Sequence, residues 1–225
     1  LPSPFNFRQH LFLGIPSDIP SPPQYGAAES DSSHIASLST LVERLIIASE
    51  GGTLILFTSY RMLQQVLEHL QAELPETIPL LYQGQMDRMR LLSRFRQESA
   101  SILLATDSFW EGVDIPGNSL RSVIITRLPF RVPTHPITRA RYAAVEQRGD
   151  NPFMTIAVPD TALKLKQGLG RLLRNDLDRG GVFILDSRIL TKFYGRILIQ
   201  ALPESALQIT DSDRLIERFE DFLYS

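Results

Sequence analysis

Short, uninterrupted apolar runs are the feature that most restricts how this sequence can fold. Clear examples are LILF at residues 54–57, ILLA at 102–105 and VFIL at 182–185. A strand covered by helices on both faces has no solvent side, so its apolar residues follow one another instead of alternating with polar ones. The runs therefore predict a sheet buried between two layers of helices.

Helical patterns separate these runs along the chain. Between residues 34 and 49, for example, Leu38, Leu41, Val42 and Leu45 recur at the spacing of one helical face. Alternation of strands and helices is typical of parallel strands joined by right-handed crossovers. The sequence therefore predicts an α/β fold with three layers and a mostly parallel central sheet flanked by helices.

The same patterns place the individual elements. Six strands are predicted at residues 10–15, 53–59, 78–83, 101–107, 120–126 and 181–186. Helices are predicted at residues 34–49, 60–74, 86–98, 136–149, 161–175, 192–201 and 213–223. Residues 21–33 are rich in Pro and Ser and predict an exposed loop.

Length and composition restrict the class of protein further. The 225 residues suit one large domain, and a net charge of -2 supplies no global positive field for tight nucleic-acid binding. The sequence contains no cysteine, which excludes a disulfide framework and any iron–sulfur cluster held by this chain, and fits a reducing, cytoplasmic compartment. No apolar run approaches the roughly 20 residues of a membrane helix. The opening LPSPFNFRQH has no signal-peptide pattern, and we expect a fragment of a longer protein.

Several common sites are missing from the sequence. It contains no phosphate loop of the form G-x-x-x-x-G-K-[ST] and no Asp–Glu pair of the Walker B kind. Its four histidines show no metal-ligand spacing, so no metal site is predicted. Gly168-x-Gly170 is followed by Leu173 where a dinucleotide fingerprint needs a small residue, and no nucleophile–base arrangement is visible.

A polar stripe marks the predicted helix at residues 161–175. Gln167, Gly170, Arg171 and Arg174 lie at positions i, i+3, i+4 and i+7, which share one helical face, while the nearby leucines fall elsewhere. The planar guanidinium fork of arginine fits phosphate oxygens in a bidentate way. The stripe therefore favours an oligophosphate ligand, with a solvated or salt-bridged helix face as the alternative.

A second unusual stretch follows the predicted strand at residues 101–107. The chain's only Trp, Trp110, is followed by Glu111, Gly112 and then Asp114. A tryptophan and three acids after a strand end are not needed for packing, which favours a binding loop. The alternative is a tryptophan at the edge of the core with acids that cap a turn.

Together these stretches resemble the second RecA-like motor domain of the DinG/XPD-like branch of superfamily 2 DNA helicases. QGLGRLLR at residues 167–174 resembles motif VI, of the form QxxGRxxR, and ATDSFWEGVDIPG at 105–117 resembles motif V. GGTLILFTSYRMLQQV at 51–66 resembles motif IV. The resemblance extends from about residue 3 to residue 203, and several linked motifs in order are more specific than any one alone.

The resemblance implies a nucleotide site shared with a missing partner domain. ATP would lie between two motor domains, with Mg²⁺ and the phosphate loop supplied by the first domain of the same parent chain. Arg174 would be the arginine finger and Arg171 its neighbour on the γ-phosphate. The other ATP-binding candidates are Gln167, Gly170, Glu111, Gly112 and Asp114, and Asp114 would approach the ribose. An iron–sulfur cluster, which many members carry, would lie in the missing part.

By the resemblance, single-stranded DNA would lie across the other surface of both motor domains. The candidate contacts follow strands at their carboxyl ends, where open α/β sheets bind their ligands. Hydroxyls and backbone amides there can hold a backbone without reading bases. The candidates are Thr58, Ser59, Tyr60, Thr106, Ser108, Arg127 and Arg131, with Arg139 and Arg141 as a possible extension of the track. A solvated helix face is the alternative for these arginines.

The resemblance therefore implies the C-terminal motor domain of an ATP-dependent helicase, expected to travel 5′ to 3′ and to be inactive alone. Two alternatives from other classes stay open. One is a stand-alone nucleic-acid-binding or interaction module without ATPase activity. The other is a small-molecule α/β enzyme, against which the absence of a nucleophile and of a cofactor loop argues.

Overall fold

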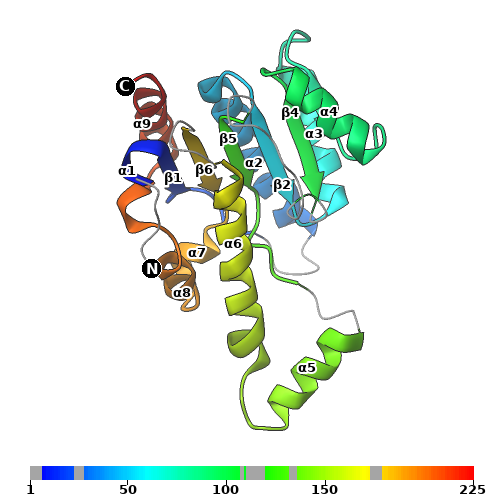
Figure 1. Ribbon diagram of the computed structural model, residues 1–225, viewed down its shortest axis with the longest axis vertical. Helices are drawn as coiled ribbons and strands as arrows, with labels where there is room; N and C mark the ends of the chain where they lie inside the picture. Colours follow the sequence, from blue (N-terminus) through cyan, green and yellow to red (C-terminus); the bar gives the residue numbers. More distant parts are fainter. Residues whose placement is uncertain (1–6, 23–27, 107–108, 110–119, 132–135, 173–178) are drawn as a thin grey trace.

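The computed structural model describes residues 7–22, 28–106, 109, 120–131, 136–172 and 179–225 (Figure 1). Its centre is a seven-stranded sheet in the order β3-β4-β2-β5-β6-β1-β7, and neighbouring strands in it are parallel. The strands are β1 (Leu11–Pro16), β2 (Thr53–Phe57), β3 (Leu80–Tyr82), β4 (Ile102–Thr106), β5 (Ser122–Ile125), β6 (Gly180–Ile184) and β7 (Leu207–Thr210).

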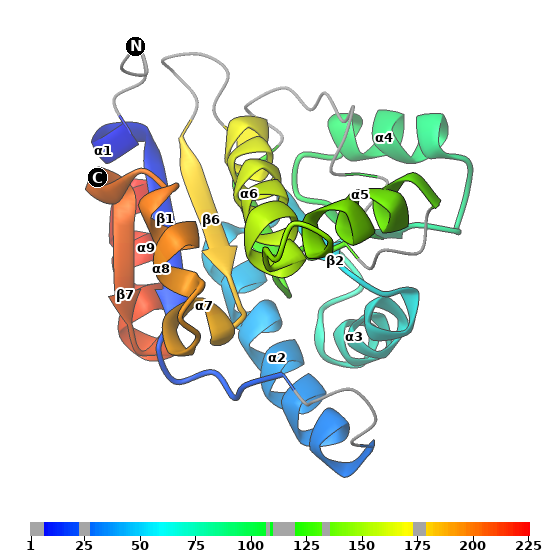
Figure 2. The same ribbon diagram turned by 90° about the horizontal axis from the view of Figure 1, so that it is seen from below.

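Helices cover both faces of the sheet (Figure 2). One face carries α2 (Ala28–Ser49), α3 (Tyr60–Glu73) and α9 (Ser212–Tyr224), whose apolar residues join one core cluster. The other face carries α4 (Arg88–Gln97), α6 (Val158–Leu172), α7 (Arg188–Thr191) and α8 (Gly195–Gln200), which contribute to a second cluster. The remaining helical elements are α1 (Phe7–His10), α5 (Pro136–Glu146), a π-helical turn (Phe153–Ala157) and a 3₁₀ turn (Glu204–Ala206). The two clusters confirm the predicted three-layer α/β fold.

Caps define where two of these helices begin. Ser59 precedes α3, and its Oγ accepts a hydrogen bond from Met62 N at 3.2 Å. Asp211 precedes α9, and its Oδ1 accepts from Arg214 N at 3.0 Å. Such caps satisfy amide groups that the first helical turn leaves unpaired. Each side chain therefore holds a helix start next to the strand that precedes it.

All six predicted strands are present, with three differences elsewhere. The strand β7 was not predicted, because its four residues are only partly buried and show no continuous apolar run. The loop predicted at residues 21–33 was wrong from Ala28 onward, where α2 already begins. The helix predicted at 192–201 corresponds to α8, which begins only at Gly195, and the short helix α7 before it was not predicted.

Two aromatic rings occupy the space above Gly181 in β6. A Cβ atom at Gly181 would lie 2.5 Å from Phe219 Cε2 and 2.8 Å from Phe183 Cε2. The rings of Phe183 and Phe219 pack edge to face, with centroids 4.8 Å apart. Since no side chain fits between them, this glycine lets α9 approach the sheet closely.

The helix α6 runs antiparallel to the strands, and its amino-terminal part extends past their carboxyl ends toward α5 (Figure 1). Its carboxyl end lies where the strands begin, since a Cβ atom at Gly180 would be 3.0 Å from Leu172 Cδ1. The π-helical turn precedes its amino end and leads back to α5, which lies away from the sheet. The last residues of α6 therefore lie near the amino ends of the strands, and its first residues lie toward the carboxyl ends.

Candidate functional site

Three predicted sites lie at the carboxyl ends of neighbouring strands. Thr58 follows β2, Thr106 ends β4 and Arg127 follows β5, and these strands are adjacent in the order β4-β2-β5. The register supports this, because Phe57 in β2 is paired with Thr106 in β4. The structure therefore brings together segments that are far apart in the sequence: Thr58 and Arg127 are separated by 69 positions (127 − 58).

Gln83, which the sequence analysis missed, connects segments at the carboxyl ends of these strands by hydrogen bonds. Its Oε1 accepts hydrogen bonds from Thr106 N and from Thr106 Oγ1, both at 2.8 Å. Its backbone oxygen accepts a hydrogen bond from the Tyr60 hydroxyl at 3.3 Å. The available signal was its place at the end of a predicted strand, as with Thr58 and Thr106. Gln83 thus joins the ends of β3 and β4 to the start of α3.

These bonds decide which of the predicted hydroxyls still has a proton to donate. The protons of Thr106 Oγ1 and of the Tyr60 hydroxyl are both directed at Gln83. Ser59 Oγ accepts from Met62 N, so its own proton stays available for a ligand. That these residues contact phosphates stays a prediction, with Ser59 in the better position to donate.

A buried carboxylate after β6 holds the segment that follows β5 and also pairs with a partly exposed arginine. The Asp186 carboxylate is fully buried and accepts from Arg188 Nη2 at 2.6 Å and from Leu128 N at 2.8 Å. Burial alone would lower the pKa of Arg188, but the hydrogen bond and charge of Asp186 outweigh it and raise that pKa. The chain after Thr126 is thus held in place by a charge that the sequence analysis did not single out.

Aromatic packing also holds the segment that carries Arg127 and Arg131, through Phe130. The Phe130 ring packs on Phe153 at 5.1 Å and on Tyr194 at 5.3 Å between centroids. Arg127 is half-buried and Arg131 is exposed. Their backbone is therefore anchored on both sides, by Asp186 and by the aromatic cluster.

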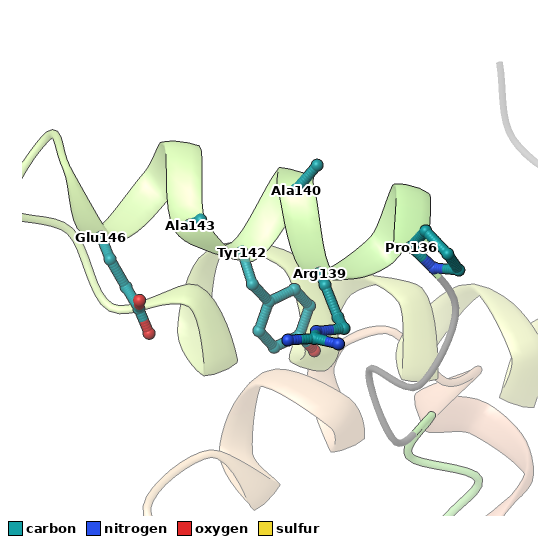
Figure 3. Close-up of a pocket in the computed structure, with 6 residues that line it drawn as sticks. All are labelled: Pro136, Arg139, Ala140, Tyr142, Ala143 and Glu146. Carbon is teal, nitrogen blue, oxygen red and sulfur yellow. The ribbon is translucent and has the colours of Figure 1, made fainter.

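The helix α5 presents its arginines to solvent and borders a shallow hollow (Figure 3). Arg139 and Arg141 are exposed, and α5 has no buried residue. The hollow is lined by Pro136, Arg139, Ala140, Tyr142, Ala143 and Glu146. Partial burial raises the pKa of the Tyr142 hydroxyl, and the charge of Asp160 on α6 adds to this.

The last turns of α6, which carry part of the polar stripe, lie at the amino ends of the strands, opposite the cluster around Gln83. Gln167 and Gly170 are exposed in its last turns, while Leu169 and Leu172 are buried, as predicted. Arg171 lies within α6. Apart from its chain neighbours and the backbone of its own helix, a Cβ atom at Gly170 would meet no atom of the described residues within 4 Å, which leaves room for a ligand beside the helix backbone. Gln167 and Gly170 thus lie on an exposed face of α6 near the amino ends of β5 and β6.

Five predicted site residues lie outside the described part of the chain. They are Arg174, Glu111, Gly112, Asp114 and Ser108. Within the described residues, no group of three or more His, Asp or Glu side chains is placed to hold a metal ion. None of the helices described is both long enough and apolar enough to cross a membrane.

Comparison with known proteins identifies relatives for most of the chain. Residues 42–205 match the family model described as "Helicase C-terminal domain". The "3'-5' exonuclease DinG" of Bacillus subtilis is 38% identical over 215 residues, which is 94% of this chain and 23% of that protein. The "ATP-dependent DNA helicase YoaA" of Haemophilus influenzae is 36% identical, over 96% of this chain and 32% of that protein. The chain thus spans a third or less of the length of these relatives.

Solved structures agree on the fold. The structure titled "XPD_APO" has a TM-score of 0.67 at 14% identity, covering 89% of this chain and 40% of that one. The "Structure of the C-terminal domain of the DEAD-box protein Dbp5" has a TM-score of 0.58 at 14% identity, covering 96% and 99%. These likenesses show the RecA-like fold that the sequence predicted.

Proposed function

Because this chain belongs to the helicase C-terminal domain family, we propose that residues 1–225 are the second motor domain of a larger, ATP-dependent DNA helicase of the DinG type. The observation that carries the proposal is the separation of two surfaces. The last turns of α6, with Gln167 and Gly170, lie where the strands begin, and the cluster around Gln83 lies where they end. One domain thereby offers separate places for a nucleotide and for a strand of DNA.

The α6 stripe suits the phosphates of ATP held mainly by another domain. Gln167 and Gly170 are exposed on it, and the space over Gly170 admits a ligand. Arg171 and Arg174 would approach the γ-phosphate, with Glu111, Gly112 and Asp114 on the nucleoside side. An arginine that reaches the γ-phosphate neutralises charge that develops in the transition state, an effect of about 10³–10⁵ in rate.

Mg²⁺ would be bound by the first motor domain, and it would neutralise charge on the β- and γ-phosphates. The described residues of this chain offer no cluster of acidic or imidazole ligands for it. An iron–sulfur cluster would likewise belong to the parent protein, since this chain has no cysteine. The isolated chain is therefore expected to lack ATPase activity.

The carboxyl edge suits the backbone of single-stranded DNA. Thr58 and Ser59 follow β2, Thr106 ends the neighbouring β4, and Arg127 and Arg131 follow β5. Closure of the two domains on ATP would bring the arginines into place, and opening after hydrolysis would shift the DNA edge. We propose 5′ to 3′ travel from the family resemblance.

Substitution of Arg174 tests the nucleotide surface. In the longer protein, Arg174→Ala should lower DNA-stimulated ATP hydrolysis by about 10³-fold or more while DNA binding is retained. Arg174→Lys should restore little, because an ammonium group lacks the planar fork. The control is Arg148→Ala, which removes an exposed arginine beyond the end of α5. Normal hydrolysis by Arg174→Ala would assign the stripe a structural role.

The 225-residue chain alone provides a second test. Phosphate release should stay at the buffer background with or without single-stranded DNA, because no phosphate loop positions the nucleotide. Robust turnover by this chain would overturn the proposal. Strand displacement on substrates with either a 5′ or a 3′ tail, measured with the longer protein, determines the direction of travel.

A further inference from the structure

An exposed tyrosine ring is held at its hydroxyl end beside the carboxyl edge of the sheet. Tyr60, the first residue of α3, is 49% exposed, and its hydroxyl donates to Gln83 O at 3.3 Å. Gly84 makes this contact possible: its φ is +99°, and a Cβ atom there would lie 2.8 Å from the hydroxyl oxygen. The ring is thus fixed at one end and open to solvent along its side.

The amide of Gln83 is oriented by its two bonds to Thr106. Thr106 N carries a hydrogen, so the atom that faces it must be the acceptor Oε1, and Nε2 must lie on the other side. The described residues supply no partner for Nε2. Gln83 is only partly buried, so its two amide protons are open to a ligand at the same edge as the Tyr60 ring.

We propose that Tyr60 and Gln83 form a subsite for one nucleotide of single-stranded DNA. The ring of Tyr60 stacks on the base, and Gln83 Nε2 donates a hydrogen bond to the adjoining phosphate. The inference rests on the proposed function, which places the strand along this edge. It changes the predicted role of Tyr60 from a hydroxyl contact to a stacking contact, because the hydroxyl proton is directed at Gln83.

The physics of the chain favours such a contact. Stacking on an aromatic ring is worth about 1–3 kcal/mol per base and tolerates every base, because each base has a π-face. A chain of net charge -2 has no global field to attract DNA, so local contacts must supply the affinity. A stacked base and a bound phosphate would supply such local affinity without distinguishing one base from another.

The test compares two labelled oligonucleotides of equal length, an oligothymidine and an oligomer of abasic sites, by fluorescence anisotropy with the 225-residue chain. This chain carries a core on both faces of its sheet. Tyr60→Ala should weaken binding of oligothymidine about fivefold or more and leave the abasic oligomer unchanged. Tyr60→Trp should bind oligothymidine at least as well as the wild type, since it retains a stacking ring.

Gln83→Glu tests the second contact without disturbing the first. A carboxylate still accepts from Thr106, but it offers no proton and repels phosphate, so both oligonucleotides should bind several-fold more weakly. The control is Tyr224→Ala, because Tyr224 is a 63% exposed tyrosine on α9, and neither affinity should change. Thermal melts of each variant verify folding.

The outcomes separate the two proposals. If the wild-type chain binds neither oligonucleotide, the proposed DNA surface is wrong, and the subsite is overturned with it. If the wild-type chain binds oligothymidine and Tyr60→Ala binds it equally well, the subsite alone is overturned. Equal weakening of both oligonucleotides by Tyr60→Ala would also refute stacking, and unchanged binding by Gln83→Glu would refute the phosphate contact.

Discussion

Gly170→Ala separates the stability of α6 from the role of its open face. Gly170 lies in the last turn of α6 and is exposed, and a Cβ atom there would meet no atom of the described residues outside its own helix and chain neighbours within 4 Å. Alanine in a helix is favoured over glycine by about 0.5–1 kcal/mol, because it loses less conformational freedom on folding. The position near the helix end places the expected gain nearer 0.5 kcal/mol by the same reasoning.

Urea denaturation and thermal unfolding of the 225-residue chain measure this gain. In a chain of this size, 0.5 kcal/mol corresponds to a rise of about 1–2 °C in Tm. The matched control is Gly181→Ala, whose Cβ would lie 2.5 Å from Phe219 Cε2. Overpacking at that position should cost about 1–3 kcal/mol, so the two glycine variants should shift Tm in opposite directions.

The functional half of the prediction concerns the longer protein. If the phosphates of ATP approach the helix backbone at Gly170, the added methyl group should obstruct them and lower ATP hydrolysis although the fold is more stable. A lower stability of Gly170→Ala would refute the reasoning from open space. A more stable variant with unchanged hydrolysis would show that the nucleotide does not approach α6 at this residue.

Other substitutions test the supports of the two surfaces. Asp186→Ala should lower the free energy of unfolding by about 3–5 kcal/mol, measured by urea denaturation, because Arg188 and Leu128 N lose their buried acceptor. The pKa of Asp211 is lowered from its ordinary 3.8, chiefly by the hydrogen bond from the backbone of Arg214. Its contribution to stability is therefore present above that value and lost as the pH falls through the folded pKa, so the Tm difference between wild type and Asp211→Ala should shrink between about pH 7 and about pH 3. In the longer protein, Asp114→Asn should raise KM for ATP with kcat nearly unchanged, because its proposed partner is a ribose hydroxyl; a collapse of kcat at constant KM would refute that role.

The sequence predicted the sheet well because most of its strands are buried on both faces. Continuous apolar runs such as residues 54–57 carry this information locally. The edge strand β7 lacks it, since its residues are partly buried and two of its four side chains are polar. Its place beside β1 depends on tertiary pairing, as Leu13 with Leu207, which no local pattern reveals.

The site was predicted unevenly for a similar reason. The stripe of α6 follows helical spacing, so the exposure of Gln167 and Gly170 could be read from the sequence. The role of Gln83 depends on a bond to Thr106 from another strand, 23 residues along the chain. Asp186 was only the last residue of a strand predicted at 181–186, and the fold shows that its carboxylate lies fully buried and paired with Arg188.

The place of β1 in the sheet has a consequence for how the chain folds. The half made of β3, β4, β2 and β5 uses only residues 53–125, so it can assemble as soon as that stretch exists. The first strand has to wait, because its partners are β6 and β7, and Leu11 is paired with Gly180. Contacts so distant in sequence form late, since a long loop must close first. Until then the apolar β1 has two open edges, which makes it the segment most in need of protection against aggregation during synthesis.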